Sequence, residues 1–161
     1  GILWIEAFDD AGDFTFNEIG LRFGGSLTYH PVNYFTGIDQ LRLLVNCVIG
    51  EPYEIPVQDR NRTDKYAILP LHVKSGKISK ISGVDKVKVM QKVFAYVPVH
   101  FEGDEIFDWN SAQQVFCYIH ILYNDVNKLK MSIKLILEVL HVESAEGEEL
   151  LFCLFDYNSL K

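Results

Sequence analysis

The chain has 161 residues, 48% of them hydrophobic, and a formal net charge of −7 at pH 7. This length and apolar content are enough to bury a core, so the composition excludes a disordered chain. The acidic balance, with no cluster of lysine and arginine, argues against nucleic acid or an anionic membrane as a partner. No apolar run reaches the ~18 residues that a membrane-spanning helix needs.

The first predicted elements are two strands, residues 2–8 and 14–20, joined by the polar turn "DDAGD". Apolar and aromatic runs on either side of a glycine-containing turn are typical of a β-hairpin. Residues 24–35 are expected to be irregular, because Gly24, Gly25 and Pro31 interrupt any period.

A helix is predicted next. Thr36, with Asp39 three residues later, resembles a capping box, and Gly50 is expected to end the helix. Its apolar stripe at helical spacing consists of Ile38, Leu41, Val45 and Val48.

The second half of the chain reads mainly as strand. Residues 66–73 and 76–83 are predicted to form a second hairpin, and residues 87–101 and 113–123 two further strands. Residues 87–101 also allow an initial helical turn.

A last helix follows, capped by Asn124 or Asp125, with an apolar stripe formed by Leu129, Ile133, Ile136, Leu137 and Leu140. Strands and helices do not alternate strictly, so the predicted class is α+β, with a largely antiparallel sheet and two main helices.

The three cysteines, Cys47, Cys117 and Cys153, are far apart and each has apolar neighbours. This predicts buried thiols in a reducing, cytoplasmic compartment, with a disulfide as the alternative.

The first hairpin brings two carboxylates together. Because strand side chains alternate, Glu6 and Glu18 are expected opposite or diagonal to each other on one half-buried face. Opposed carboxylates need a counter-charge, which Arg22 or a divalent cation such as Mg²⁺ can supply. The aromatic residues predicted on the same face are Trp4, Phe8, Phe14 and Phe16.

Plainer interpretations stay open for each part of this pattern. The glutamates can lie on a solvated face, with Arg22 as a surface ion pair of little energetic value. Gly24-Gly25 can be an ordinary turn. The functional interpretation is that Gly24, Gly25 and Ser26 form a backbone that approaches a ligand closely.

The stretch from "WIEAF" to "NEIGLRFGG" resembles the metal-binding hairpin of the ATP-grasp superfamily. Glu6 matches its first acidic residue, Glu18 and Arg22 match the strand that follows about a dozen residues later, and Gly24-Gly25 matches a tail common in its carboxylate–amine ligases. Gly20 stands where the family has an asparagine, and simple alternation predicts that Asn17 points to the other face.

This resemblance covers roughly residues 1–110, and residues 111–161 are expected to be a family-variable strand–helix extension. It implies a single domain, residues 1–161, resembling the C-terminal lobe of an ATP-grasp fold and cut from a longer enzyme. The sequence begins at Gly1, directly before a predicted strand, which also indicates a piece cut from a longer protein.

The implied activity is ATP-dependent ligation of a carboxylate to an amine through an acyl phosphate, with the isolated chain inactive. Glu6 and Glu18 would hold Mg²⁺ or Mn²⁺, Arg22 would act in catalysis, and Gly24, Gly25 and Ser26 would bind substrate. The implied partners are the N-terminal ATP-binding lobe and the small-molecule carboxylate and amine, and a homodimer is expected. The alternative is a non-catalytic binding module derived from such a lobe.

Overall fold

A computed structural model describes residues 2–56, 63–107 and 114–160. The chain forms two compact units, Gly1–Arg62 and Thr63–Lys161. Every strand pairing among the described residues is antiparallel and helices accompany the sheets, which confirms the predicted α+β class.

The first unit begins with the predicted hairpin. Strand β1 (Trp4–Asp10) pairs with β2 (Asp13–Gly20) around a tight turn. In the turn, Ala11 adopts φ 53° and Gly12 φ 100°, and the Gly12 N–H donates to Asp9 Oδ1 at 2.9 Å. The hairpin prediction is therefore confirmed.

Two helices follow where one was predicted: α1 (Tyr29–Thr36) and α2 (Gln40–Ile49). The prediction that residues 24–35 are irregular is wrong for the part that forms α1. Pro31 lies in the first turn of this helix, where a missing N–H breaks no intrahelical bond. Thr36 ends α1 instead of starting α2, and Asp39 caps α2 by accepting from Arg42 N–H at 3.0 Å. Gly50 terminates α2 in the left-handed conformation, as predicted.

The first unit has little core of its own, since none of residues 2–56 is buried. Three residues of the predicted stripe, Leu41, Val45 and Val48, are exposed on α2, whereas Ile38 precedes the helix and is partly buried. The half-buried setting expected for the hairpin is also wrong, because nearly every residue of β1 and β2 is exposed.

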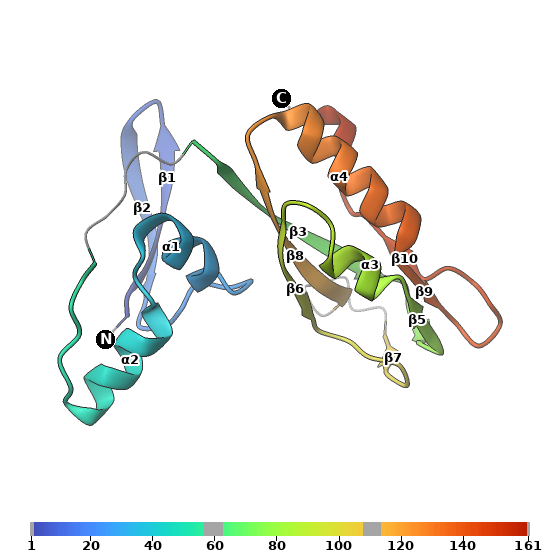
Figure 1. Ribbon diagram of the computed structural model, residues 1–161, viewed down its shortest axis with the longest axis horizontal. Helices are drawn as coiled ribbons and strands as arrows, with labels where there is room; N and C mark the ends of the chain where they lie inside the picture. Colours follow the sequence, from blue (N-terminus) through green and yellow to red (C-terminus); the bar gives the residue numbers. More distant parts are fainter. Residues whose placement is uncertain (1, 57–62, 108–113, 161) are drawn as a thin grey trace. The chain divides into compact units, whose positions relative to one another are not determined.

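The second unit contains the core, built on a four-stranded sheet (Figure 1). Its order is β10 (Leu151–Phe152), β3 (Lys65–Val73), β8 (Val115–Tyr123) and β6 (Val93–Pro98). The central strand β8 is buried along most of its length, with Phe116, Ile119 and Ile121 at 0% exposure. The prediction for β8 began at residue 113, which lies outside the described residues.

Two short ladders replace the predicted second hairpin. Strand β4 (Gly76–Lys77) pairs with β7 (Glu105–Ile106), and β5 (Lys80–Ser82) pairs with β9 (His141–Glu143). The prediction failed because β8 and β10 already occupy the two edges of β3, so residues 76–83 bond to distant strands.

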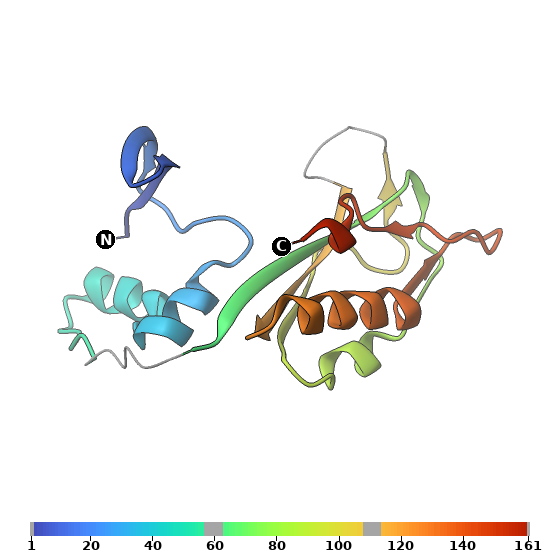
Figure 2. The ribbon, with the colours of Figure 1, turned by 90° about the horizontal axis from the view of Figure 1, so that it is seen from above.

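Helices α3 (Val84–Lys88) and α4 (Val126–Val139) lie on the same side of the sheet, as Figures 1 and 2 show together. Asp125 caps α4 by accepting from the N–H groups of Asn127 and Lys128, which confirms one of the two predicted caps. The predicted stripe packs inward: Leu129, Ile133, Ile136 and Leu140 are buried and Leu137 is partly buried. A short 3₁₀ helix, η2 (Tyr157–Ser159), follows β10. No helix among the described residues has the length and apolar content to cross a membrane.

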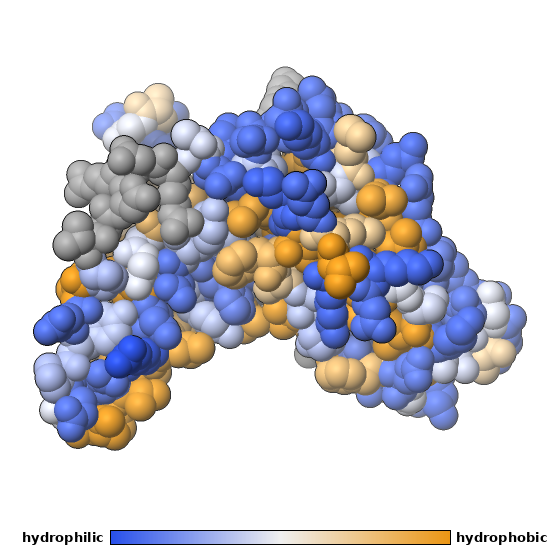
Figure 3. Space-filling model, viewed as in Figure 1, coloured by the Kyte–Doolittle hydropathy of each residue, from blue (hydrophilic) through white to orange (hydrophobic). Residues whose placement is uncertain are grey.

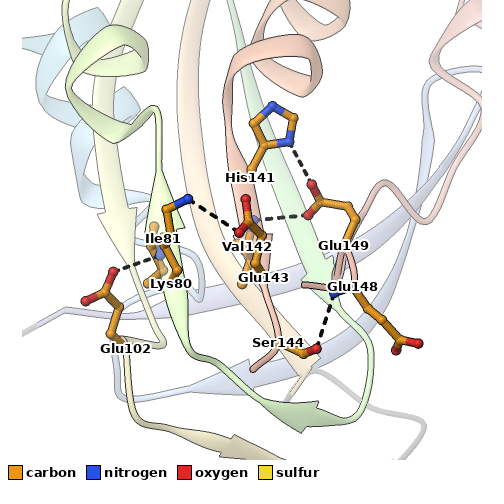
Figure 4. Close-up of polar contacts among 9 residues, drawn as sticks. All are labelled: Lys80, Ile81, Glu102, His141, Val142, Glu143, Ser144, Glu148 and Glu149. Carbon is orange, nitrogen blue, oxygen red and sulfur yellow. Dashed lines mark hydrogen bonds and ion pairs between the residues drawn. The ribbon is translucent and has the colours of Figure 1, made fainter. Parts of the chain in front are cut away.

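A carboxylate fastens β9 to the segment that leads into β10 (Figure 4). Glu149 Oε1 accepts from the N–H groups of Val142 and Leu151, each at 3.0 Å, and Glu149 Oε2 lies 2.7 Å from His141 Nδ1. Burial by itself raises the pKa of Glu149, but the hydrogen bonds from Val142, His141 and Leu151 outweigh it and hold this pKa below the ordinary 4.5. The ionised carboxylate therefore stabilises this corner of the second unit.

None of the three cysteines forms a disulfide, as expected. Cys117 is buried, and burial raises the pKa of its thiol to about 12, which makes it a poor nucleophile. Cys153 is partly buried, whereas Cys47, expected to be buried, is exposed on α2.

Candidate functional site

The two glutamates of the hairpin lie directly opposite each other. The register pairs Trp4 with Gly20, Ile5 with Ile19 and Glu6 with Glu18. Opposed residues in an antiparallel pair have their Cβ atoms ~4.5–5.5 Å apart. Alternation and turn length together predicted this juxtaposition, and the register confirms it.

A β-bulge follows this pair and changes what surrounds the glutamates. The register shifts between Glu6 and Ala7, so that Ala7 pairs with Phe16 and Asn17 is the extra residue of β2. Asn17 Nδ2 donates to Glu6 Oε1 at 2.6 Å. The prediction that Asn17 points away from the glutamates is therefore wrong, because a bulge suspends the simple alternation.

The bulge also separates two faces of the hairpin. Phe14 pairs with Asp9, and Phe16 pairs with Ala7. Because paired residues share a face and β1 alternates, both phenylalanines lie on the side opposite to the glutamates. The predicted grouping of both phenylalanines with the glutamates is wrong for the same reason. We name the two sides by their members: the carboxylate face has Trp4, Glu6, Phe8 and Glu18, and the apolar face has Ile5, Ala7, Phe14, Phe16 and Ile19.

Arg22 supplies a cation to the carboxylate face. Its Nη2 donates to Glu18 Oε1 at 3.2 Å, and its Nη1 donates to the Phe23 carbonyl at 3.1 Å. The two side chains are 56% and 52% exposed, so water screens the pair and its contribution to stability is small. One guanidinium opposes two carboxylates, so the three groups together retain one negative charge.

Gly20 makes room for this arginine. A Cβ added at Gly20 would lie 3.3 Å from both Cγ and Nε of Arg22, closer than side chains usually approach. The arginine therefore crosses over the Gly20 backbone, where any larger residue would crowd it. The carboxamide group on this face comes from Asn17 instead.

The glycine pair that follows is asymmetric. A Cβ on Gly24 would overlap the Trp4 ring and Thr28 Oγ1, whereas a Cβ on Gly25 would meet no atom within 4 Å. Gly24 is thus required for packing of the loop on the hairpin, and Gly25 faces open space. The next two residues, Ser26 and Leu27, have left-handed φ values of 54° and 56°. Strained non-glycine residues of this kind are common at ligand-binding loops.

The donor set fits one hard divalent cation. Among the described residues, Glu6 and Glu18 each use one carboxylate oxygen in a hydrogen bond, to Asn17 and Arg22 respectively, which leaves Oε2 of each available. Mg²⁺ is commonly bound by one or two carboxylates, with waters and substrate phosphates completing its octahedron. Within the described part of the chain, no group of three or more His, Cys, Asp and Glu residues is placed to hold a metal.

Sequence reasoning missed Asn17 and the role of Trp4. The bulge leaves one trace in the sequence, because β2 has eight residues where β1 has seven, but element boundaries inferred from a sequence are too uncertain to reveal a one-residue excess. The contact between Trp4 and Gly24 depends on the path of the loop, which no local pattern encodes.

No family model and no curated protein matches the chain. Solved structures that share its fold include two enzymes. An L-amino acid ligase from Bacillus licheniformis superposes with a TM-score of 0.67 at 20% identity, and a phosphoribosylglycinamide synthetase from Anaerococcus prevotii with a TM-score of 0.69 at 13% identity. Each alignment covers 88% of this chain and 36% of the other, so the chain spans about a third of the length of either protein. Since both are ATP-grasp enzymes, the chain has the fold of part of an ATP-grasp ligase.

Proposed function

We propose that the chain is the metal-holding part of an ATP-dependent ligase that joins a carboxylate to an amine. The observation that carries the proposal is the opposed pair of Glu6 and Glu18, flanked by Asn17 and Arg22 and followed by an open glycine. This group lies in a chain whose fold matches parts of two ligases.

The reaction has two steps. An oxygen of the substrate carboxylate attacks the γ-phosphorus of ATP, which gives an acyl phosphate and ADP. The amine nitrogen then attacks the acyl carbon, an amide bond forms, the C–O bond breaks with release of inorganic phosphate, and the nitrogen loses a proton to solvent. Bound Mg²⁺ would neutralise charge on the β- and γ-phosphates during the first step.

Each residue of the site has a definite task in this scheme. Glu6 and Glu18 provide the oxygen ligands, and Asn17 fixes the orientation of the Glu6 carboxylate by its hydrogen bond. The fork-shaped guanidinium of Arg22 suits two-point contact with an acyl phosphate or carboxylate. With no Cβ, Gly25 lets a substrate reach the main-chain N–H groups of Gly25 and Ser26.

The proposal includes a larger enzyme. The chain spans 36% of the length of each of these two structures, and the apolar face of its hairpin is open to solvent, with Phe14 74% and Phe16 60% exposed. An ATP-binding lobe packed on this face would bury those side chains and provide the adenine and phosphate contacts. We therefore place the activity in a longer protein and expect the isolated chain to be inactive.

Metal binding by the full chain tests the site directly. Mg²⁺ or Mn²⁺ should raise the thermal midpoint, because a ligand that binds only the folded state stabilises it, by about 2.7 kcal/mol when its concentration is 100 times Kd. Glu6→Gln and Glu18→Gln should abolish this response, and Glu6→Gln should raise the midpoint of the metal-free chain by removing the like-charge pair. Glu54→Gln, an equal charge change at another exposed glutamate of the first unit, is the matched control.

The same experiment distinguishes the proposed ligase from the rival function, a non-catalytic binding module. In the structure one oxygen of Glu6 accepts from Asn17 and one oxygen of Glu18 accepts from Arg22, so contacts within the chain already orient both carboxylates. A wild-type chain with no thermal response to either metal, and no Mn²⁺ binding by electron paramagnetic resonance, would favour the binding module and contradict the ligase.

A further inference from the structure

The second unit contains a cavity that the proposed ligase site does not use. It has a volume of about 780 Å³ and lies between α4, the end of β8 and the turn after α3, within the range of ~300–1,000 Å³ typical of small-molecule sites. The buried stripe of α4 faces the sheet, whereas Met131 and Leu135 line the cavity and are 70% and 47% exposed. Helix α4 therefore presents a second apolar stripe to solvent.

The walls combine apolar and basic side chains. Met90 and Tyr123 complete an apolar lining, and methionine adapts readily to ligands of different shape. Figure 3 shows hydrophobic and hydrophilic residues close together on the surface around α4. A site of this kind suits a ligand with an apolar body and a polar head.

The charged side chains around the cavity indicate the charge of the ligand's polar head. Lys92, Lys128 and Lys134 line the cavity with one acidic residue, Glu138. Lys134 is 3.8 Å from Glu138, and Lys92 is 3.5 Å from Asp64 beside the cavity. Asp125 bonds the backbone N–H of Lys128, but among the described residues no acidic side chain forms an ion pair with its ammonium group, so this charge is available to a ligand.

The backbone at Lys92 provides an independent observation. Lys92 has φ 75°, a left-handed conformation that favours glycine. The turn is fixed there, because the Leu122 N–H donates to the Lys92 carbonyl at 2.9 Å and the Val93 N–H donates to the Met90 carbonyl at 3.2 Å. A glycine would adopt this conformation with less strain, so Lys92 occupies the position at a cost in stability. Strain of this kind is characteristic of ligand-binding positions.

We propose that this cavity binds a small molecule with an apolar body and a single negatively charged group. Lys128 supplies the charge that opposes the anion, Lys92 adds a further N–H contact while it stays paired with Asp64, and Met90, Met131 and Leu135 contact the apolar part. The site shares no residue with the hairpin and does not depend on the ligase function.

The chain offers a selective probe of this site. Met90 and Met131 are its only two methionines, and both line the cavity. Full-length protein labelled with ¹³C at the methionine methyl groups should give two signals, which Met131→Leu assigns. Octanoate, below its micellar concentration, should shift both signals saturably, whereas octylammonium, with the same chain and the opposite charge, should bind at least about tenfold more weakly.

Two variants and a control complete the test. Lys128→Gln should weaken octanoate binding about tenfold or more, and Lys77→Gln, at an exposed lysine outside the cavity, should leave it unchanged. Lys92→Gly should weaken binding while keeping or raising the thermal midpoint. Equal binding of octanoate and octylammonium, unchanged binding by Lys128→Gln, or unmoved methyl signals would each overturn the proposal. A large drop in the midpoint of Lys92→Gly would overturn the argument from strain.

Discussion

The two adjacent glycines beside the carboxylate face should respond very differently to the same substitution. At Gly24 an alanine Cβ would overlap the Trp4 ring and Thr28 Oγ1, whereas at Gly25 it would meet nothing within 4 Å. Overpacking of this kind costs ~1–3 kcal/mol, and replacing glycine by alanine restricts the unfolded chain, which returns ~0.4–1 kcal/mol. Gly24→Ala should therefore destabilise the first unit by about 1–2 kcal/mol, and Gly25→Ala should be neutral or stabilising by a few tenths of a kcal/mol.

Trp4 makes this measurement local. The only other tryptophan is Trp109, so a Trp109→Phe background leaves Trp4 as the sole reporter of the first unit. Denaturant titration followed by Trp4 fluorescence should show a lower midpoint and an altered native emission for Gly24→Ala, because the ring must move. Equal midpoints for Gly24→Ala and Gly25→Ala would refute the packing of Trp4 on Gly24. Gly25→Ala is then the variant in which to measure substrate contacts, since its fold is intact.

The remaining predictions concern charge, surface and activity. Because the folded-state pKa of Glu149 is lowered, its contribution to stability is present above the unfolded value of 4.5 and is lost as pH falls through the folded value; thermal melts should show wild type more stable than Glu149→Gln at neutral pH, with the difference shrinking below pH 4.5. The exposed apolar face should cause self-association, so sedimentation should detect dimers that Phe16→Lys weakens, and a strict monomer at high concentration would contradict this. Asn17→Ala should weaken Mn²⁺ binding several-fold without abolishing it, because both carboxylates remain; an unchanged Kd would show that Asn17 does not position Glu6. The isolated chain should not hydrolyse ATP, and steady hydrolysis that Glu18→Gln abolishes would show that the proposed ATP-binding lobe is not needed for it.

The parts of the fold that the sequence predicted correctly depend on interactions between residues close together in the sequence. The hairpin follows from two apolar runs and a polar turn, and the opposition of Glu6 and Glu18 follows from alternation across that turn. Similarly, Asp125 and the apolar stripe of the last helix act within a few residues of each other. These features need no knowledge of what packs against them.

The parts that failed depend on partners distant in the sequence. Residues 76–83 have strand character, but β3 is already paired on both edges, so their hydrogen bonds go to β7 and β9. Helix α1 was missed because Pro31 reads as a breaker unless its place in the first turn is known. At the site, Asn17 was assigned to the wrong face because it is an inserted residue. Such a residue interrupts the alternation, so that even-numbered and odd-numbered residues of β2 exchange faces across the bulge.

The bulge gives the hairpin an unusual tolerance to shortening. Seven residues of β1 pair with a strand β2 of eight residues, and Asn17 is the one that has no partner in the ladder. If Asn17 were deleted, Glu18 would still oppose Glu6, Phe16 would still oppose Ala7, and the ladder would become regular. Loss of one residue from a strand normally rotates its neighbours to the wrong side of the sheet. Here it would remove a single amide from Glu6 and leave every other pair in place, so a shortened hairpin separates what Asn17 does for the glutamates from what it does for the fold.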